Sequence, residues 1–304
     1  LLVDDGAGGT LRKTTAARVK TYIGAVTTIA GLAEVSMDIT NFTDGILIQP
    51  NSDGSAPTTG TLDAANENVG IGSNVFASLT SADNCVGIGS YALDAMTTGS
   101  SNVAMGYLAG SGQVAGSENL YLGHGSGFSS TSGNNNIHIG VESGRYVTGN
   151  DNICIGHDAG MTGSPGGQIT SGNNILVLGD ENISASHIQT DWTVASDQRD
   201  KTDFTALDVG LDFVNDLKPY TYKWDKRSKY GDKYGADGFR DSNYDLDNQT
   251  PDGTHKEDWL DIGFKAQEVE ALEKAAGYKI ADKTNLTTTL TEDGKQYGIK
   301  YSNF

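Results

Sequence analysis

The sequence predicts a mainly β repeat stalk, a trimeric β-helix or β-roll, followed by an α+β domain. A short unit of two apolar residues around any third residue, closed by glycine, recurs between Val69 and Gly179. After Gly179 the repeats stop and the sequence becomes richer in aromatic and charged residues. The chain has 304 residues, which is enough for two domains of ordinary size.

The closing glycines of the repeat unit are spaced 17, 17, 17, 17, 16 and 23 residues apart. A fixed period this short indicates stacked coils, each made of one structural unit. Alternation places the two apolar residues of a unit on one face of a short strand, and the glycine permits a turn or a close backbone approach. The closing glycines are Gly72, Gly89, Gly106, Gly123, Gly140, Gly156 and Gly179.

Two further positions recur in most coils. A small residue stands three positions after the glycine, and an asparagine, which suits left-handed or Asx turns, precedes the apolar pair. The small residues are Ala92, Ala109, Ser126, Ser143 and Ala159, and the asparagines are Asn68, Asn102, Asn119, Asn136 and Asn152.

Each coil offers about two large apolar side chains, which is too few for an isolated slim coil to bury a good core. Several identical chains could pack these apolar faces together. The sequence therefore predicts a homotrimer with a three-fold axis along the stack, and a single-chain solenoid is the alternative. Cys85 and Cys154 lie four coils apart, or roughly 19 Å at about 4.8 Å per coil, so we expect two buried thiols rather than a disulfide.

The charge and the hydropathy pattern exclude several classes of partner. The formal net charge is −18, which argues against binding nucleic acid or an anionic membrane surface. No run of 18 apolar residues predicts membrane insertion. We interpret the glycine-rich stretch 123–127 as a turn and the acidic stretch 241–247 as a solvated loop, so no cofactor and no metal is expected. Three copies of His124, His138 or His157 could meet on a three-fold axis, but surface or hydrogen-bonded histidines are commoner.

The C-terminal third mixes helical and strand patterns. Apolar residues at helical spacing predict a helix within 204–217, which Pro219 ends. Strands are predicted at 220–224, 262–264 and 297–301, and an acidic helix is predicted over 266–274. Residues 226–258 are polar and loop-like, and residues 11–22 could form a short helix.

Several of these segments resemble known families. The repeats resemble the head repeats of trimeric bacterial adhesins and the shafts of phage tail fibres, and the opening residues 1–24 resemble segments of phage fibre proteins. Three stretches together resemble the intramolecular chaperone domain of phage endosialidases and tail fibres, peptidase family S74. These are S-D-x-R-x-K at 196–201, L-K-P-Y-T-Y-K-W at 217–224 and I-G-F-K-A-Q-E-V at 262–269. The expected division is a connecting or shaft segment at 1–65, a repeat shaft at 66–190 and the chaperone domain at 191–304.

The resemblance implies a function for the boundary motif. A domain of this family helps three chains wind into the shaft and then cuts itself off, here between Ala195 and Ser196. Ser196 would be the nucleophile and Lys201 its base, which requires a neutral amine. Asp197 and Arg199 would be structural or orienting. The residues alone also fit a helix N-cap at Ser196, and they leave open whether attack is direct or an acyl shift.

The same resemblance implies partners and a location. The expected partners are two further copies of the chain, upstream fibre or virion proteins, and a bacterial surface glycan or receptor. The expected location is the virion, after assembly in the host cytoplasm, and the sequence is expected to be the C-terminal piece of a longer protein. Two other functions stay open: a trimeric adhesin whose C-terminal domain does not cleave, and a polysaccharide-degrading enzyme. Asp200 departs from the family, which commonly has an apolar residue there.

Overall fold

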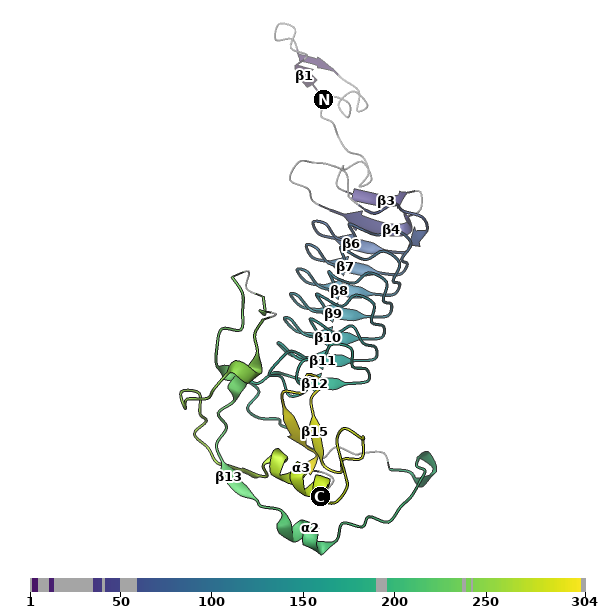
Figure 1. Cartoon of the computed structure of the whole chain (residues 1–304). Helices are drawn as coiled ribbons and strands as arrows, with labels where there is room; N and C mark the ends of the chain where they lie inside the picture. The colour runs from purple at the N-terminus through teal and green to yellow at the C-terminus, as the bar shows by residue number, and fades with distance from the viewer. Residues whose placement is uncertain are drawn as a thin grey trace.

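The chain forms a parallel β-solenoid followed by a small α+β region at the C-terminal end of the stack (Figure 1). The computed structural model describes residues 2–4, 11–13, 35–39, 42–49, 59–189, 196–236, 239–241 and 243–301. This arrangement confirms the predicted fold class, a β repeat stalk followed by an α+β domain. Within the described residues, no helix is both long enough and apolar enough to cross a membrane.

One strand from each coil contributes to a single sheet that runs the length of the solenoid. The neighbours in this sheet follow the order β12, β11, β10, β9, β8, β7, β6, β4 and β3. Pairing is parallel from β4 to β12, whereas β3 pairs antiparallel with β4. The strands are β3 Val35–Ile39, β4 Phe42–Ile48, β5 Ala65–Asn66, β6 Val69–Ile71, β7 Val86–Ile88, β8 Val103–Met105, β9 Leu120–Leu122, β10 Ile137–Ile139, β11 Ile153–Ile155 and β12 Leu176–Leu178.

The two apolar residues of each repeat face out of the solenoid, and the residue between them faces in. In β8, Ala104 is fully buried while Met105 is 44% exposed. The same pattern of a buried middle residue holds from β6 to β12. The apolar pairs therefore leave an outward apolar face along the sheet. The core lies inside one chain, so the expectation that a single coil buries too little is wrong.

This inner core is filled by side chains whose sizes compensate between neighbouring coils. Gly70 and Gly87 stand at the middle position of β6 and β7, and a Cβ on either would press against the ring of Phe76. In β9 the middle residue is Tyr121, and there Gly110 and Gly127 leave the space for its ring. Close packing of this kind stabilises the solenoid from within.

Stacking also explains the closing glycine of each repeat. Gly89 has φ +130°, a conformation that disfavours side chains, and a Cβ there would overlap the carbonyl of Gly106 in the next coil. The asparagines differ from the prediction. Asn102, Asn119 and Asn136 form a buried ladder, in which the side-chain oxygen of one accepts from the backbone N–H of the next at 2.9–3.0 Å. The left-handed residue is the preceding one, such as Ser101 or Glu118.

The C-terminal region consists of short elements around one helix. The predicted helix within 204–217 is shorter than expected, Leu211–Asp216, and residues 11–13, assigned to a short helix, form a strand. Near the N-terminus, β1 Leu2–Asp4 and β2 Leu11–Lys13 form a separate two-stranded sheet. The C-terminal elements are the 3-10 helix η2 Gln198–Asp200, α2 Leu211–Asp216, β13 Tyr220–Tyr222, the 3-10 helices η3 Arg227–Lys229 and η4 Leu246–Asn248, β14 Asp261–Gly263, α3 Ala266–Ala275, β15 Thr288–Leu290 and β16 Tyr297–Ile299. The sequence did not indicate β15, which pairs antiparallel with β16.

Candidate functional site

The boundary motif brings the predicted nucleophile and base into direct contact. The Nζ atom of Lys201 lies 2.5 Å from the Oγ atom of Ser196 and 3.4 Å from the Ser196 carbonyl oxygen. The 3-10 helix η2 turns the chain between them and carries the lysine back to the serine. A hydroxyl held this close to an amine is the local arrangement that proton transfer requires.

Asp197 and Arg199 shape this turn. Asp197, rather than Ser196, is the N-cap of η2, because its carboxylate accepts from the backbone N–H of Arg199 at 2.9 Å. The Arg199 guanidinium also donates to both carboxylate oxygens, at 3.1, 3.2 and 2.6 Å. These bonds hold the pKa of Asp197 below its ordinary value. The pair fixes the turn that sets Lys201 against Ser196.

The dyad is open to solvent in the single chain. Ser196 and Lys201 are both exposed. Among the ion pairs of the described residues none joins Asp200 to Lys201, although the two are neighbours in sequence. Ala195, the residue on the other side of the predicted cleavage site, lies outside the described residues.

The other two family-like stretches come together as a structural unit. β13 pairs antiparallel with β14, which sets Tyr220 opposite Gly263 and Tyr222 opposite Asp261. The Tyr220 hydroxyl donates to Glu268 on α3 at 3.0 Å. The Nζ atom of Lys265 stands 4.2 Å from the centre of the Tyr220 ring. The two motifs therefore build one sheet-and-helix platform.

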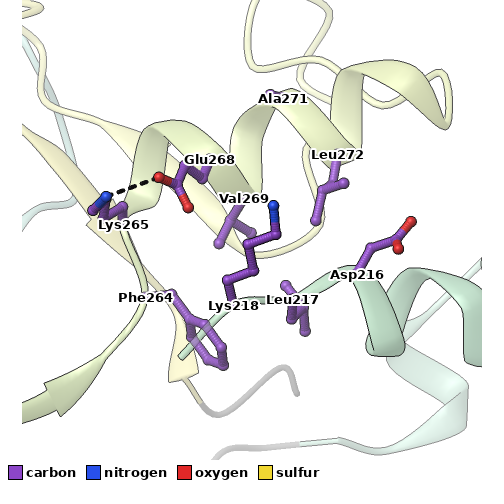
Figure 2. Close-up of a pocket in the computed structure, with 9 residues that line it drawn as sticks. All are labelled: Asp216, Leu217, Lys218, Phe264, Lys265, Glu268, Val269, Ala271 and Leu272. Carbon is purple, nitrogen blue, oxygen red and sulfur yellow. Dashed lines mark hydrogen bonds and ion pairs between the residues drawn. The ribbon is translucent and has the colours of Figure 1, made fainter. Parts of the chain in front are cut away.

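A small pocket of about 210 Å³ lies under α3 on this platform (Figure 2). Its walls include Phe264, Val269 and Leu272, and the chain at Leu217 and Lys218 crosses its mouth. An ion pair of 3.0 Å between Lys265 and Glu268 lies at its edge. No residue of the 196–201 motif lines it, so the pocket is separate from the dyad.

The α+β region docks on the flank of the solenoid through a buried charge network. Arg240 donates through Nη1 to Asp158 at 2.8 Å and through Nη2 to the carbonyl of Thr162. Its backbone N–H donates to Glu142 at 2.9 Å. The side chains of Arg240 and Asp158 are each 2% exposed. Burial raises the pKa of Glu142, and the bond from Arg240 partly offsets this effect. Because an unpaired buried charge is costly, this network favours the one docked arrangement in which Arg240 meets Asp158.

An aromatic contact extends the same dock. Phe239 lies against His124 and Phe128 of the solenoid, with ring centres 4.8 and 5.7 Å apart. The guanidinium of Arg145 stands over both phenylalanine rings, at 4.3 Å from Phe128 and 4.5 Å from Phe239. Arg145 also pairs with Glu142 at 2.8 Å, which ties this stack to the charge network.

Sequence reasoning missed the docking residues because they lie in unremarkable settings. Arg240 stands in the polar stretch 226–258, which was interpreted as a loop. One signal was available at the position two residues after the closing glycine. That position is acidic in two successive coils, at Glu142 and Asp158, whereas earlier coils have Asn74, Tyr91, Leu108 and Gly125.

The remaining candidate residues are explained by packing. Cys85 and Cys154 are buried free thiols, as predicted. His138 is fully buried inside its own coil beside Tyr121, so it does not lie on the outward face where copies could meet. In the acidic stretch, Asp245 pairs with Lys295 at 2.6 Å. Within the part of the chain that the structure describes, no group of three or more His, Cys, Asp or Glu side chains is placed to hold a metal ion.

Comparisons with known proteins agree with the three motifs. No curated protein and no solved structure matched the chain significantly. The scan against family models matched residues 196–278 to the chaperone of endosialidase, Peptidase_S74. The match begins at Ser196 and includes both the 217–224 and the 262–269 stretches. Residues 196–278 therefore form an endosialidase-type chaperone domain, set directly after a parallel β-solenoid.

Proposed function

We propose that this chain is a phage tail fibre or tailspike protein whose C-terminal domain drives homotrimer assembly of the shaft and is then released by cleavage between Ala195 and Ser196. The observation that carries the proposal is the contact of 2.5 Å between Ser196 and Lys201 at the first residue of the family match. The position of this contact, at the junction of shaft and chaperone domain, means that one cut would break the covalent link between the two.

The cleavage step follows from the groups at the junction. Lys201, as a neutral amine, takes the hydroxyl proton while Ser196 Oγ forms a bond to the carbonyl carbon of Ala195. Loss of the Ser196 amide nitrogen, which leaves as an amine after taking a proton, gives an ester that water hydrolyses. Direct hydrolysis with Ser196 and Lys201 activating the water gives the same two products. Proximity allows a single slow turnover to suffice.

The exposure of the dyad links cleavage to assembly. A neutral amine at neutral pH needs burial or a neighbouring cation. The single chain does not supply burial, because Lys201 is exposed. We therefore expect cleavage to follow trimer formation, when additional copies can cover the motif. Release after assembly would leave a shaft that cannot easily refold, which is kinetic stability.

Two exposed apolar surfaces support the homotrimer. One is the outward face of the solenoid sheet, which includes Met105, Ile155 and Leu178 at 44%, 39% and 48% exposure. The other is α2 with the segment before it, where Leu207 and Leu211 are 62% and 72% exposed. Contiguous apolar surface of this kind marks an interface, and a second and third copy of the chain would cover it.

The cleavage proposal is tested by intact mass. We expect the full chain to separate into two pieces that meet at Ala195 and Ser196, while Ser196→Ala and Lys201→Ala each stay whole. Ser186→Ala, which changes an exposed serine of the preceding segment, serves as the matched control and should cleave normally. A parent chain that stays whole as an established trimer would rule out autocleavage.

The trimer proposal is tested by light scattering. The double variant Met105→Glu, Ile155→Glu should turn a trimer into a monomer while circular dichroism keeps its β signature, because both side chains face outward. Val114→Glu places the same charge at an exposed turn corner and should stay trimeric. A monomeric parent chain would contradict the proposal.

A second function, a trimeric adhesin whose C-terminal domain does not cleave, is favoured by one observation. Both residues of the dyad are exposed to solvent in this chain. In that case the parent, Ser196→Ala and Lys201→Ala would all remain whole, and the Ser186→Ala control would give the same mass pattern. Cell binding by the uncut trimer would then support the adhesin, whereas tail incorporation and clean cleavage would support the fibre.

A further inference from the structure

The open end of the solenoid is covered by a carboxylate from the chaperone domain. Glu292 lies in the turn between β15 and β16, which Figure 1 shows directly beyond β12. Its carboxylate accepts from the backbone N–H groups of Thr170, Ser171 and Gly172 at 3.3, 3.0 and 3.1 Å. The hydroxyls of Thr170 and Ser171 donate to it as well, at 2.9 and 3.0 Å. Three amides and two hydroxyls thus converge on one side chain.

The interior coils use the same donors at the same repeat position, but their acceptor is a backbone carbonyl. The N–H and hydroxyl of Thr97 and the N–H of Thr98 all donate to the carbonyl of Val114 in the next coil, at 2.9, 3.0 and 3.3 Å. Thr148 and Gly149 donate in the same way to the carbonyl of Thr170. Glu292 therefore stands where a further coil would present its carbonyl oxygen.

The glycine that follows these donors shows the same replacement of a backbone oxygen by the carboxylate of Glu292. A Cβ on Gly116 would overlap the carbonyl oxygen of Gly133, and one on Gly149 would overlap that of Gly172. On Gly172 itself, the Cβ would lie 2.6 Å from the Oε2 atom of Glu292. Successive coils thus bring glycine against a backbone oxygen, and the last coil brings it against the carboxylate.

The turn that carries Glu292 has internal hydrogen bonds and one further bond to the solenoid. Thr291 donates its backbone N–H to Gln296 at 2.9 Å and its hydroxyl to Asp293 at 2.5 Å. Asp293 also accepts from the backbone N–H of Gln168 in the last coil, at 3.2 Å. Burial alone would raise the pKa of Glu292, but the bonds from Ser171 and Thr170 outweigh it and keep the pKa below its ordinary value. The charged form that these donors favour is thus the one present at neutral pH.

We propose that Thr170, Ser171 and Gly172 form a carboxylate-binding site at the C-terminal end of the solenoid, and that Glu292 is its built-in ligand. By occupying this site, Glu292 caps a row of N–H groups that would otherwise end at an open edge. The site exists only when the last coil has folded, because only then do the donors converge. The chaperone domain thereby recognises a finished shaft end. Its meaning for assembly rests on the proposed function, but the capping contact itself does not.

The test uses the full chain made uncleavable by Ser196→Ala, and measures hydrogen exchange at residues 170–172. Glu292→Ala and Glu292→Gln should accelerate this exchange by roughly tenfold or more, because hydrogen bonds to a charged acceptor are lost. Exchange at Thr97, Thr98 and α3 should not change. Asp282→Asn, which removes an exposed carboxylate of the same domain, is the matched control and should leave residues 170–172 protected.

A rescue experiment identifies the ligand chemistry. Sodium acetate should slow exchange at residues 170–172 in Glu292→Ala, and sodium chloride at the same ionic strength should not. Equal exchange in the parent and in Glu292→Ala would overturn the inference, and so would equal rescue by both salts. If Glu292→Ala also accelerates exchange in α3, Gly172→Ala provides a second test that leaves the C-terminal region unchanged. The added Cβ would displace the carboxylate of Glu292 and should accelerate exchange at residues 170–172 to the same extent.

The outcomes separate this inference from the proposed function. Light scattering on the same samples reports trimer formation, and intact mass of the parent chain, which keeps Ser196, reports cleavage. If the parent chain is monomeric or stays whole while Glu292→Gln exchanges tenfold faster at residues 170–172, the cap is kept and the fibre assembly proposal is rejected. A cleaving trimer in which Glu292→Gln leaves exchange unchanged would reject the cap alone.

Discussion

At the scale of single residues, the middle position of each repeat decides what a coil buries. Tyr121 and His138 occupy this position in neighbouring coils, fully buried, with ring centres 5.5 Å apart. Neither ring nitrogen of His138 has a hydrogen-bond partner within the described residues. Burial lowers the pKa of His138 to about 3, so the ring is neutral in the folded chain at ordinary pH. A buried polar group of this kind weakens the coil that contains it.

Replacing His138 should therefore stabilise the solenoid. We expect His138→Leu to raise the free energy of unfolding at pH 7 by about 1 kcal/mol or more. Because the folded pKa lies below the unfolded one, the parent loses stability as pH falls below about 6.5, by up to about 1.4 kcal/mol per pH unit. Thermal melts at pH 7 and pH 5 measure both effects. His187→Leu, at an exposed histidine, should leave the pH dependence as it is in the parent; a pH dependence equally steep in His138→Leu would contradict the assignment.

The residues of the candidate site differed in how visible they were in the sequence. Ser196 and Lys201 could be named because they belong to one short motif, and a turn of one 3-10 helix suffices to bring them together. Glu142 and Arg240 are 98 residues apart, and only the fold makes them neighbours. A contact between distant segments leaves no periodic signal, so the dock and the Glu292 cap needed the structure.

At the scale of elements, the repeat period predicted the strands but not which way they face. Alternation puts the two apolar residues of a unit on one side of the strand, and it is silent on whether that side is the core. The space inside the solenoid decides which side faces the core. The middle residues range in size from Gly70 to Tyr121: Gly70 leaves room for the ring of Phe76, and glycines leave room for the ring of Tyr121. β15 was missed for a different reason. It is three residues long, Thr288–Leu290, and its main anchor is a glutamate on α3.

The glutamate on α3 that anchors β15 is Glu273. Glu273, fully buried on α3, accepts from the N–H and hydroxyl of Thr287 and of Thr288, at 2.5 to 3.1 Å. Burial alone would raise its pKa, but the bonds from Thr288 and Thr287 outweigh it and keep the pKa below the ordinary value. Glu273→Gln should lower the stability of the chaperone domain by about 1.5–3 kcal/mol, because bonds to a charge are lost.

Urea titrations followed by tryptophan fluorescence measure this loss. A carboxylate with a depressed folded pKa contributes stability above its unfolded pKa of about 4.3 and loses it as pH falls further, so the parent should weaken in acid and Glu273→Gln should weaken less. Glu268→Gln, on the exposed face of the same helix, should lower the stability clearly less than Glu273→Gln does, because a solvent-exposed ion pair contributes little. Equal losses in the two variants would contradict the anchoring role.

At the scale of the whole molecule, the C-terminal α+β region contacts the solenoid in two places. The loop around Arg240 binds the flank of the coils that contain Glu142 and Asp158. The turn at Glu292 covers the C-terminal end of the solenoid. The last coil is longer than the others, with 23 residues between closing glycines in place of 16 or 17. The extra residues supply part of the dock, including the carbonyl of Thr162 that Arg240 contacts. The end of the repeats at Gly179 coincides with the last solenoid strand, Leu176–Leu178, and could be predicted from the sequence. The contacts between the two regions could not, because they depend on charges that pair only after folding.

From these two sets of contacts we predict that cutting the chain does not by itself separate the solenoid from the C-terminal region. A protease site introduced within 190–195 of the Ser196→Ala chain would allow a cut at will, and we expect both pieces to co-elute in gel filtration. Arg240→Ala should release the domain, because it leaves the buried carboxylate of Asp158 without its guanidinium partner, a loss of about 3–5 kcal/mol. Lys256→Ala removes an exposed positive charge from the same domain and should still co-elute. If the two pieces of the cut chain elute separately even with Arg240 present, the docking contacts are too weak to hold them together. If co-elution is lost in Arg240→Ala and kept in Lys256→Ala, the buried pair of Arg240 and Asp158 holds the two pieces together.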